Sequence, residues 1–305
     1  MNELFSPELI QMIVDGLGRG SGYALLALGL AIIFGVMHLL NFAHGELITI
    51  SAYVAYFLSQ TEHPFWSNWW VLAAAIIITS VVFAVATDFV AFRRVRGSSD
   101  FTMLLTSFGL VILVRAAFSH WVELKPRNFD KAGWIFDTIE IAGIRIELYD
   151  LAVISITVIT LIALTIILQR TMFGLSLRAA SEDFDAARLM GINSDRVIRN
   201  AFALSGLLAG IGGVMLLLRR GQAEPGMGIE ILLIPLLATV IGGLGSLKGA
   251  VIGGLLLGLL EVMFRGLILP DAFSHFTDLV IFILIAVLFV VRPQGLITVH
   301  RAERV

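Results

Sequence analysis

Residues 70–92 read WVLAAAIIITSVVFAVATDFVAF, and this stretch decides the fold class. It carries one charged side chain, Asp88, and it is longer than the about 20 residues that a helix needs to cross the hydrocarbon core of a bilayer. Similar apolar stretches recur at residues 23–40, 42–58, 101–121, 148–168, 197–218 and 279–291. The sequence therefore predicts an all-α polytopic membrane protein with about 8–10 membrane helices, some of them broken or re-entrant, in a single transmembrane domain over residues 1–305.

The composition excludes several classes of protein. Hydrophobic residues make up 58% of the chain and charged residues 14%, which is far from an ordinary soluble domain. The absence of cysteine excludes disulfides, thiolate catalysis and zinc–thiolate sites. The net charge of −2 gives no indication of nucleic-acid binding.

The N-terminal region shows no basic segment followed by a cleavable apolar segment, so no removable signal peptide is expected. Residues 7–17 are interpreted as a short interfacial or partly inserted helix. The glycine-rich run at residues 16–22 is expected to break this helix from the first span.

Arginines indicate which loops face the cytoplasm. They cluster at residues 93–96, 170–199 and 292–301, and the positive-inside rule assigns these regions to the cytoplasmic side. The loop at about residues 122–147 has a weak basic excess and is assigned to the outer face. The segment at about residues 171–197 then lies in the cytoplasm.

The first of two interrupted apolar regions carries polar residues at its break. The interruption contains Asn41, Phe42, His44, Gly45 and Glu46. Polar and ionisable groups are costly in hydrocarbon, so these residues are candidates to line a permeation pathway if they lie inside the membrane. The alternative is a cytosolic turn between two ordinary helices, with Asn41 capping the second. A catalytic or metal-binding role for His44 and Glu46 lacks further convergent ligands nearby.

The second interruption divides residues 229–269, which are too many for one span. Lys248 follows Leu247 and precedes Gly249, so the order of a nucleotide-binding loop is missing. Glycines here, and Gly253, Gly254 and Gly258 beyond, favour close approach between helices. The residues of this break that are also candidates for the pathway are Gly242, Gly243, Gly245 and Ser246.

Other polar groups within the apolar stretches are few. Thr106 and Ser107 form a polar notch that lines the pathway or serves helix packing. Glu261 and Arg265 are four residues apart, a spacing that predicts an ion pair on one helix face. Asp88 and Arg115 are expected to extend toward the membrane surface from positions near helix ends.

The cytoplasmic segment contains signals for a short helix of about nine residues. Ser181 is the expected N-cap, and Glu182 and Asp183 place negative charge near the positive end of the helix dipole. Gly191 is the expected C-terminal stop. Phe184, Ala187 and Met190 are spaced along one stripe of this helix.

These motifs resemble those of a known family. The segments GYALLALG (22–29), NFAHGE (41–46), RAASED (178–183), IGGLGS (241–246) and RPQGL (292–296) occur in the order found in LivH-type permeases of bacterial branched-chain amino acid ABC importers. The resemblance extends over residues 20–297. It implies a multi-pass permease of the bacterial inner membrane that catalyses no reaction itself.

The resemblance also implies partners. These are a second, related permease, two cytosolic ATPase subunits and a periplasmic solute-binding protein. ATP and magnesium would be bound by the ATPase subunits, and this chain would need no cofactor or metal. The cytoplasmic segment would dock on an ATPase subunit through Ser181, Glu182, Asp183, Phe184, Ala187, Arg188, Met190 and Gly191.

The solute remains open between several classes. The resemblance implies branched-chain or other neutral amino acids, with urea, short amides or carboxylates as alternatives within the same family. An alternative of another class is an ion-coupled secondary transporter, for which Glu46 is the candidate ion or proton site. A capped cytoplasmic helix argues against that class, because a self-sufficient carrier needs no docking element.

Overall fold

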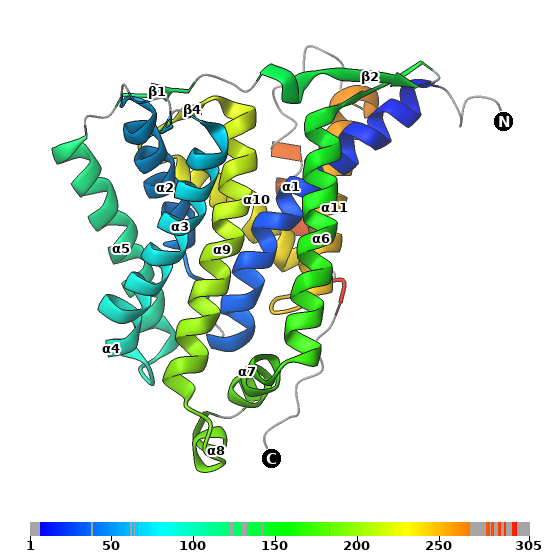
Figure 1. Cartoon of the computed structure of the whole chain (residues 1–305). Coiled ribbons are helices and arrows are strands. Elements are labelled where there is room, and N and C mark those ends of the chain that lie inside the picture. The colour runs from blue at the N-terminus through cyan, green and yellow to red at the C-terminus, as the bar shows by residue number, and fades with distance from the viewer. Residues whose placement is uncertain are drawn as a thin grey trace. The chain divides into compact units, whose positions relative to one another are not determined.

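The computed structural model describes residues 7–37, 39–61, 63, 65–66, 68–122, 125–129, 133–141, 143–182, 184–268, 279–280, 282–283, 286–287, 290 and 295–297. Within them the chain is mostly helical (Figure 1). The α-helices are α1 (Pro7–Met37), α2 (His44–Ser59), α3 (Trp69–Thr87), α4 (Arg93–Val95), α5 (Asp100–Trp121), α6 (Leu148–Arg170), α7 (Met172–Glu182), α8 (Phe184–Leu189), α9 (Ser194–Arg220), α10 (Met227–Gly242) and α11 (Leu247–Met263). Shorter elements are the π-helical turns η2 (Asp88–Phe92) and η4 (Phe264–Ile268), the 3-10 turn η3 (Gly133–Phe136), and the strands β1 (Arg127–Asn128), β2 (Thr138–Ile141), β3 (Ile144–Glu147) and β4 (Gln222–Ala223).

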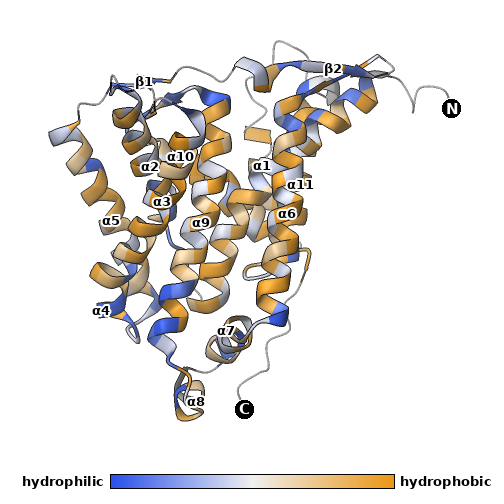
Figure 2. Cartoon of the chain, viewed as in Figure 1, coloured by the Kyte–Doolittle hydropathy of each residue, from blue (hydrophilic) through white to orange (hydrophobic). Residues whose placement is uncertain are grey.

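Six helical segments in the described part of the chain are long and apolar enough to cross a membrane. They contain α1, α3, α5, α6, α9 and α11. The helices α2 and α10 have 16 residues each, which is short for a full span. Figure 2 shows hydrophobic residues along the helices and hydrophilic residues near α4 and at the start of α9. The prediction of an all-α polytopic membrane protein is confirmed. Six of the 13 positions of the expected span at residues 279–291 lie outside the described residues.

The chain forms two compact units. One contains Leu28–Lys131 and Leu161–Ile234, and we call it the α3–α9 unit. The other contains Met1–Ala27, Ala132–Thr160 and Pro235–Val305, and we call it the α1–α11 unit.

The core of the α3–α9 unit is built on small residues between helices. A Cβ added to Gly206 would lie 2.7 Å from the carbonyl oxygen of Ser80, and one added to Gly210 would lie 2.7 Å from the Cα of Ile77. Helix α3 therefore approaches α9 almost to backbone contact, as small residues allow between membrane helices. Figure 1 shows α2, α3 and α9 close together.

In the α1–α11 unit, the expectation of a break in the N-terminal region is wrong. The glycine-rich run at residues 16–22 does not break the chain, because α1 is continuous from Pro7 to Met37. A Cβ on Gly16 would lie 2.8 Å from Leu259, and one on Gly20 would lie 2.8 Å from the Cα of Leu255. These glycines stay helical because a continuous helix satisfies its own backbone groups, and the absence of side chains lets α11 approach.

The loop at residues 122–147 contains short strands that the sequence did not indicate. Strands β2 and β3 form an antiparallel hairpin with Thr138 opposite Glu147. Strand β1 pairs with β4, with Arg127 opposite Ala223. The second pair attaches this loop to the segment that joins α9 to α10.

The second predicted break lies in the α1–α11 unit and has the expected position. Helix α10 ends at Gly242, and Gly243 and Gly245 take positive φ angles of 107° and 84°. Ser246 is the N-cap of α11, and its hydroxyl accepts a hydrogen bond from the N–H of Gly249 at 3.0 Å. A Cβ on Gly242 would overlap the carbonyl group of Gly249, so the prediction of close helix approach is confirmed.

Candidate permeation site and coupling segment

The break before α2 lies halfway along two membrane spans. The hydroxyl of Ser80 donates to the carbonyl of Leu47 at 3.4 Å, and Ser80 is the twelfth residue of the 27-residue span Trp69–Val95. The hydroxyl of Ser205 lies 3.2 Å from Nδ1 of His44, and Ser205 is the twelfth residue of the 27-residue span Ser194–Arg220. The start of α2 is therefore near mid-depth rather than at the end of the spans, which supports the intramembrane interpretation over a cytosolic turn.

Local hydrogen bonds satisfy the backbone of this break. Asn41 is 4% exposed, and its Oδ1 accepts a hydrogen bond from the N–H of Ala43 at 3.1 Å. The N–H of His44 donates to the carbonyl of Asn41 at 3.2 Å. The N-cap position of α2 is Ala43, which has no side chain able to cap. Asn41 thus forms a turn that leads into the helix. It does not cap α2, although the cytosolic-turn alternative required it to do so.

His44 holds the break against α1 and α9. The Ser205 hydroxyl donates to the carbonyl of Gly29 at 2.9 Å, so Nδ1–H of His44 must be the donor to the Ser205 oxygen. A Cβ on Gly29 would lie 2.8 Å from Nε2 of His44. The imidazole is 2% exposed and packs directly on the backbone of α1. This geometry gives His44 a positioning role.

Glu46 is the charged group of the site. Its side chain is 1% exposed, and neither carboxylate oxygen has a hydrogen-bond partner among the described residues. The Nε of Arg115, on α5, lies 3.9 Å from Oε1 of Glu46. Nη2 of Arg115 donates to the carbonyl of Gly226 at 3.1 Å. The sequence did not indicate this role for Arg115, because its partners lie 69 and 111 positions away.

The first turns of α2 and α10 meet at two glycines. A Cβ on Gly45 would overlap the carbonyl oxygen of Gly228. A Cβ on Gly228 would lie 2.7 Å from the carbonyl carbon of Gly45 and 2.7 Å from Oγ1 of Thr49. Two helix N-termini, each the positive end of a dipole, therefore converge beside Glu46 and Arg115.

Helix α5 reaches the break through an aromatic contact. Phe42 and Phe108 stack with ring centroids 4.3 Å apart. The neighbouring hydroxyls serve their own helix, since Thr106 donates to the carbonyl of Thr102 and Ser107 to that of Leu104, each at 2.8 Å. Of the predicted pathway residues, the five at residues 41–46 and the two on α5 belong to the α3–α9 unit. The residues from Gly242 to Ser246 belong to the other unit.

The predicted coupling segment, residues 171–197, differs from its expected structure at one end. Ser181 lies in the last turn of α7, and its hydroxyl donates to the carbonyl of Arg178 at 2.8 Å. The expected N-cap at Ser181 is therefore wrong, because α7 continues through this residue to Glu182 and the hydroxyl bonds back within the helix. The short helix α8 spans Phe184–Leu189. Asp183 and the side chain of Phe184 lie outside the described residues.

The other end of this segment agrees with its prediction. Gly191 has a φ of +84°, and its N–H donates to the carbonyl of Arg188 at 3.0 Å. The N–H of Ile192 donates to the carbonyl of Ala187 at 3.0 Å, which completes a Schellman ending. Ala187 is buried whereas Met190 is 83% exposed, so they do not share one buried stripe. The turn instead presents Met190 and Leu189, which is 89% exposed, outward.

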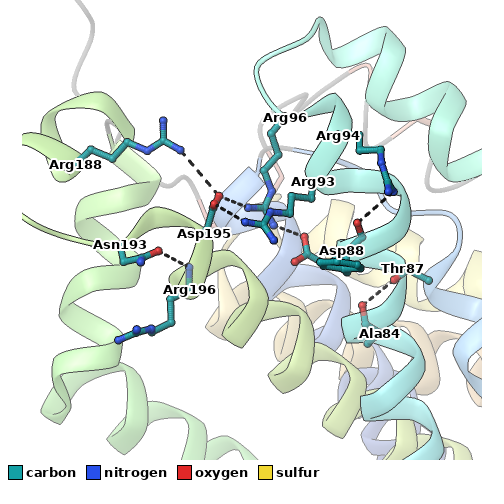
Figure 3. A network of polar contacts seen from close by, with 11 residues as sticks. Ala84, Thr87, Asp88, Arg93, Arg94, Arg96, Arg188, Asn193, Asp195 and Arg196 are labelled. Carbon is teal, nitrogen blue, oxygen red and sulfur yellow. Dashed lines mark hydrogen bonds and ion pairs between the residues drawn. The ribbon is translucent and has the colours of Figure 1, made fainter.

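An ion-pair network attaches this segment to the end of α3 (Figure 3). Asp195, in the first turn of α9, is 2.6 Å from Nη1 of Arg96, 3.2 Å from Nη2 of Arg93 and 3.9 Å from Nη2 of Arg188. Arg96 also pairs with Asp88 in η2. Asp195 thus joins α8 and α9 to α4 and η2. No local pattern in the sequence indicates this network, because Arg93 and Arg96 are 102 and 99 positions from Asp195.

Comparisons with known proteins agree with this architecture. The family described as "Branched-chain amino acid transport system / permease component" matches residues 12–291. The permease BraD of Pseudomonas aeruginosa is 31% identical over 98% of this chain and 100% of its own length. The permease LivH of Escherichia coli strain K12 is 31% identical over 100% of both chains.

The permease LivM of Escherichia coli strain K12 is 24% identical over 92% of this chain and 69% of its own length. BraD, LivH and LivM are all named as permease proteins of high-affinity branched-chain amino acid transport systems. The sequence motifs, the membrane spans and the full-length matches agree with one another. This chain is a multi-pass membrane protein and belongs to the family of permease components of branched-chain amino acid transport systems.

Proposed function

We propose that this chain is one of two permease subunits of an ATP-driven importer of the bacterial inner membrane, and that the solute is a branched-chain or other neutral amino acid. The main support is the buried break before α2, halfway along the neighbouring spans, where Glu46 and Arg115 lie beside the N-termini of α2 and α10. Ionisable residues at this depth are expensive, and in transporters they mark the path of the solute. The family relationship supplies the class of solute.

The second permease would be a related chain of the LivM kind. Support comes from the match to LivM, which is a different permease of the same named transport system as LivH. Two ATPase subunits would bind ATP and magnesium on the cytoplasmic side. A periplasmic solute-binding protein would deliver the solute from the other side.

The turn at the end of α8 would be the docking element for an ATPase subunit. Leu189 and Met190 are exposed apolar residues on a segment otherwise rich in charge, and such side chains favour burial in a partner's groove. Movement of α8 would reach α9 directly and reach η2 through Asp195, Arg96 and Asp88. ATP binding would shift the permease between its two states only as far as the ATPase subunits bind those states with different affinity.

Reconstitution in liposomes tests this proposal. We expect the four-component membrane complex with its binding protein to accumulate leucine only when ATP is supplied, and isoleucine and valine to compete. Competition by urea, acetamide or a carboxylate, without competition by isoleucine, would assign another solute of the family. Uptake by the two permeases alone under an ion gradient would instead establish an ion-coupled transporter.

A further inference from the structure

The Glu46 carboxylate combines nearly complete burial with unused hydrogen-bonding capacity. The side chain is 1% exposed, and both oxygens lack a hydrogen bond to any described residue. Buried polar groups are normally hydrogen-bonded, so a buried carboxylate with both oxygens unpaired indicates a missing partner.

The Arg115 guanidinium balances the charge of Glu46 without binding it closely. Their separation of 3.9 Å exceeds hydrogen-bond distance, and the Arg115 side chain is 46% exposed while that of Glu46 is buried. One nitrogen of Arg115 is bound to the carbonyl of Gly226 instead. Two other carboxylates near the start of α10 have partners of their own: Glu224 accepts a hydrogen bond from Nε2 of Gln222 at 2.6 Å, and Glu230, which is 69% exposed, lies 4.0 Å from Arg220. Arg115 is therefore the cation next to Glu46, and its exposed side chain is free to change partner.

The surroundings of this pair are suited to an anion as well as to a cation. The first turns of α2 and α10 meet at Gly45 and Gly228 with no side chain between their backbones. Helix N-termini attract negative charge, and in membrane transporters such ends face the carboxylate of a solute. The same small region thus offers a carboxylate for a cation, and a guanidinium with two helix ends for an anion.

We propose that Glu46 and Arg115 exchange their mutual ion pair for the two charges of an α-amino acid zwitterion. The α-ammonium group of the solute binds Glu46, and its α-carboxylate binds Arg115 beside the helix N-termini. This inference rests on the proposed transport function and adds a selectivity element within the permease itself. When a zwitterion binds, every charge keeps a partner of opposite sign. A solute with an amine but no carboxylate leaves Arg115 without a partner, and a solute with a carboxylate but no amine leaves Glu46 without one.

Charge-removing variants in the complete reconstituted complex test the exchange. We expect Glu46→Gln and Arg115→Gln each to lower the initial rate of ATP-driven leucine uptake at least about tenfold, which corresponds to losing one hydrogen bond to a charged group. Glu46→Asp should retain more uptake than Glu46→Gln. The control is the ion pair of Glu140 and Arg145, whose side chains are 63% and 75% exposed. Glu140→Gln and Arg145→Gln should leave uptake unchanged.

The double variant Glu46→Gln/Arg115→Gln separates solute binding from mutual neutralisation. If both residues bind the solute, the double variant is at least as impaired as either single variant. Recovery of uptake in the double variant would overturn the inference, because it would show that each residue only compensates the other's charge. Unchanged uptake in Glu46→Gln would overturn it too.

The unmodified complex supplies the remaining control. Inhibition of its leucine uptake by L-valine but not by leucinamide or isovalerate supports the exchange. Equal inhibition by all three contradicts it while leaving the transport function intact. Absence of ATP-driven leucine uptake in the unmodified complex would overturn the proposed function and this inference together.

Discussion

Asp195→Asn should uncouple ATP hydrolysis from uptake while leaving the fold nearly unchanged. Asp195 connects α8 and α9 to α4 and η2 through its contacts with Arg96, Arg93 and Arg188. Asparagine has nearly the same shape but carries no charge, so the change weakens all three contacts. This single substitution therefore weakens the ion-pair connection that runs from α8 through Asp195 and Arg96 to η2.

The expected stability cost is small because the network is mostly exposed at this point. The side chains of Asp195, Arg93 and Arg188 are 41%, 49% and 60% exposed, and exposed ion pairs contribute about 0–1 kcal/mol each. Arg96 is 14% exposed, but it keeps its second partner, Asp88. We therefore expect Asp195→Asn to lower the free energy of unfolding by about 1 kcal/mol.

Asp88→Asn is the matched comparison within the same network. The Asp88 side chain is 4% exposed and Arg96 is 14% exposed, so its neutralisation breaks a largely buried ion pair, although Arg96 keeps its contact with Asp195 at 2.6 Å. Because Arg96 keeps this partner, we expect a cost at the low end of the range for a broken buried pair, about 3 kcal/mol. At about 2–4 °C per kcal/mol, Asp88→Asn should lower Tm by roughly 10 °C, whereas Asp195→Asn should lower it by only a few degrees.

The assay is the number of leucine molecules taken up per ATP hydrolysed, measured together with Tm for both variants. We expect Asp195→Asn to keep ATPase activity and a near-normal Tm while this ratio falls. An unchanged ratio in Asp195→Asn would refute the transmission role of the network. A Tm loss equal to that of Asp88→Asn would refute the assignment of Asp195 to the exposed part of the network.

Further changes test the packing on which both units depend. Gly45→Ala should destabilise the α3–α9 unit by about 1–3 kcal/mol or more, since the added methyl group overlaps the Gly228 carbonyl; Gly109→Ala, where a Cβ meets nothing within 4 Å, is the control and should not lower Tm. Glu261→Ala should cost about 1–3 kcal/mol, because Arg19 at 2.7 Å, Arg265 at 3.1 Å and the Tyr23 hydroxyl at 2.6 Å lose their shared carboxylate while the two arginine side chains stay 29% and 46% exposed, and a Tm equal to that of the unmodified chain would contradict this network. Gly191→Ala should cost about 1–2 kcal/mol at a φ of +84°, while Gly191→Asn is better tolerated; equal loss of docking in both variants, measured by co-purification of the ATPase subunits, would argue against a role for the turn geometry.

The sequence predicted the membrane fold well because length and hydropathy are local signals. Apolar stretches gave the spans, and the polar residues at 41–46 and the glycines at 242–249 gave the two breaks. Glu261 and Arg265 were predicted to pair because a spacing of four places them on one helix face, and they do so at 3.1 Å. Gly191 was predicted to end a helix because few other residues adopt its backbone angle.

The failures share a physical cause, which is that the deciding partner lies far away in the chain. A glycine run breaks a helix in isolation, but Gly16 and Gly20 face α11 and stay helical. Serine before acidic residues is typical of an N-cap, but α7 arrives at Ser181 already helical. The partners of Arg115 are likewise set by tertiary packing, which no local pattern reveals.

Site-directed cross-linking tests the docking of the α8 turn most directly. The chain has no cysteine, so Met190→Cys, at a position 83% exposed, introduces a single thiol. Trp121→Cys, at the far end of α5 and 78% exposed, is the control. With a short thiol-reactive photo-cross-linker in the functional complex, we predict a covalent product with an ATPase subunit from position 190 and none from position 121. A complex that imports leucine but gives no ATPase product from position 190 would contradict the account.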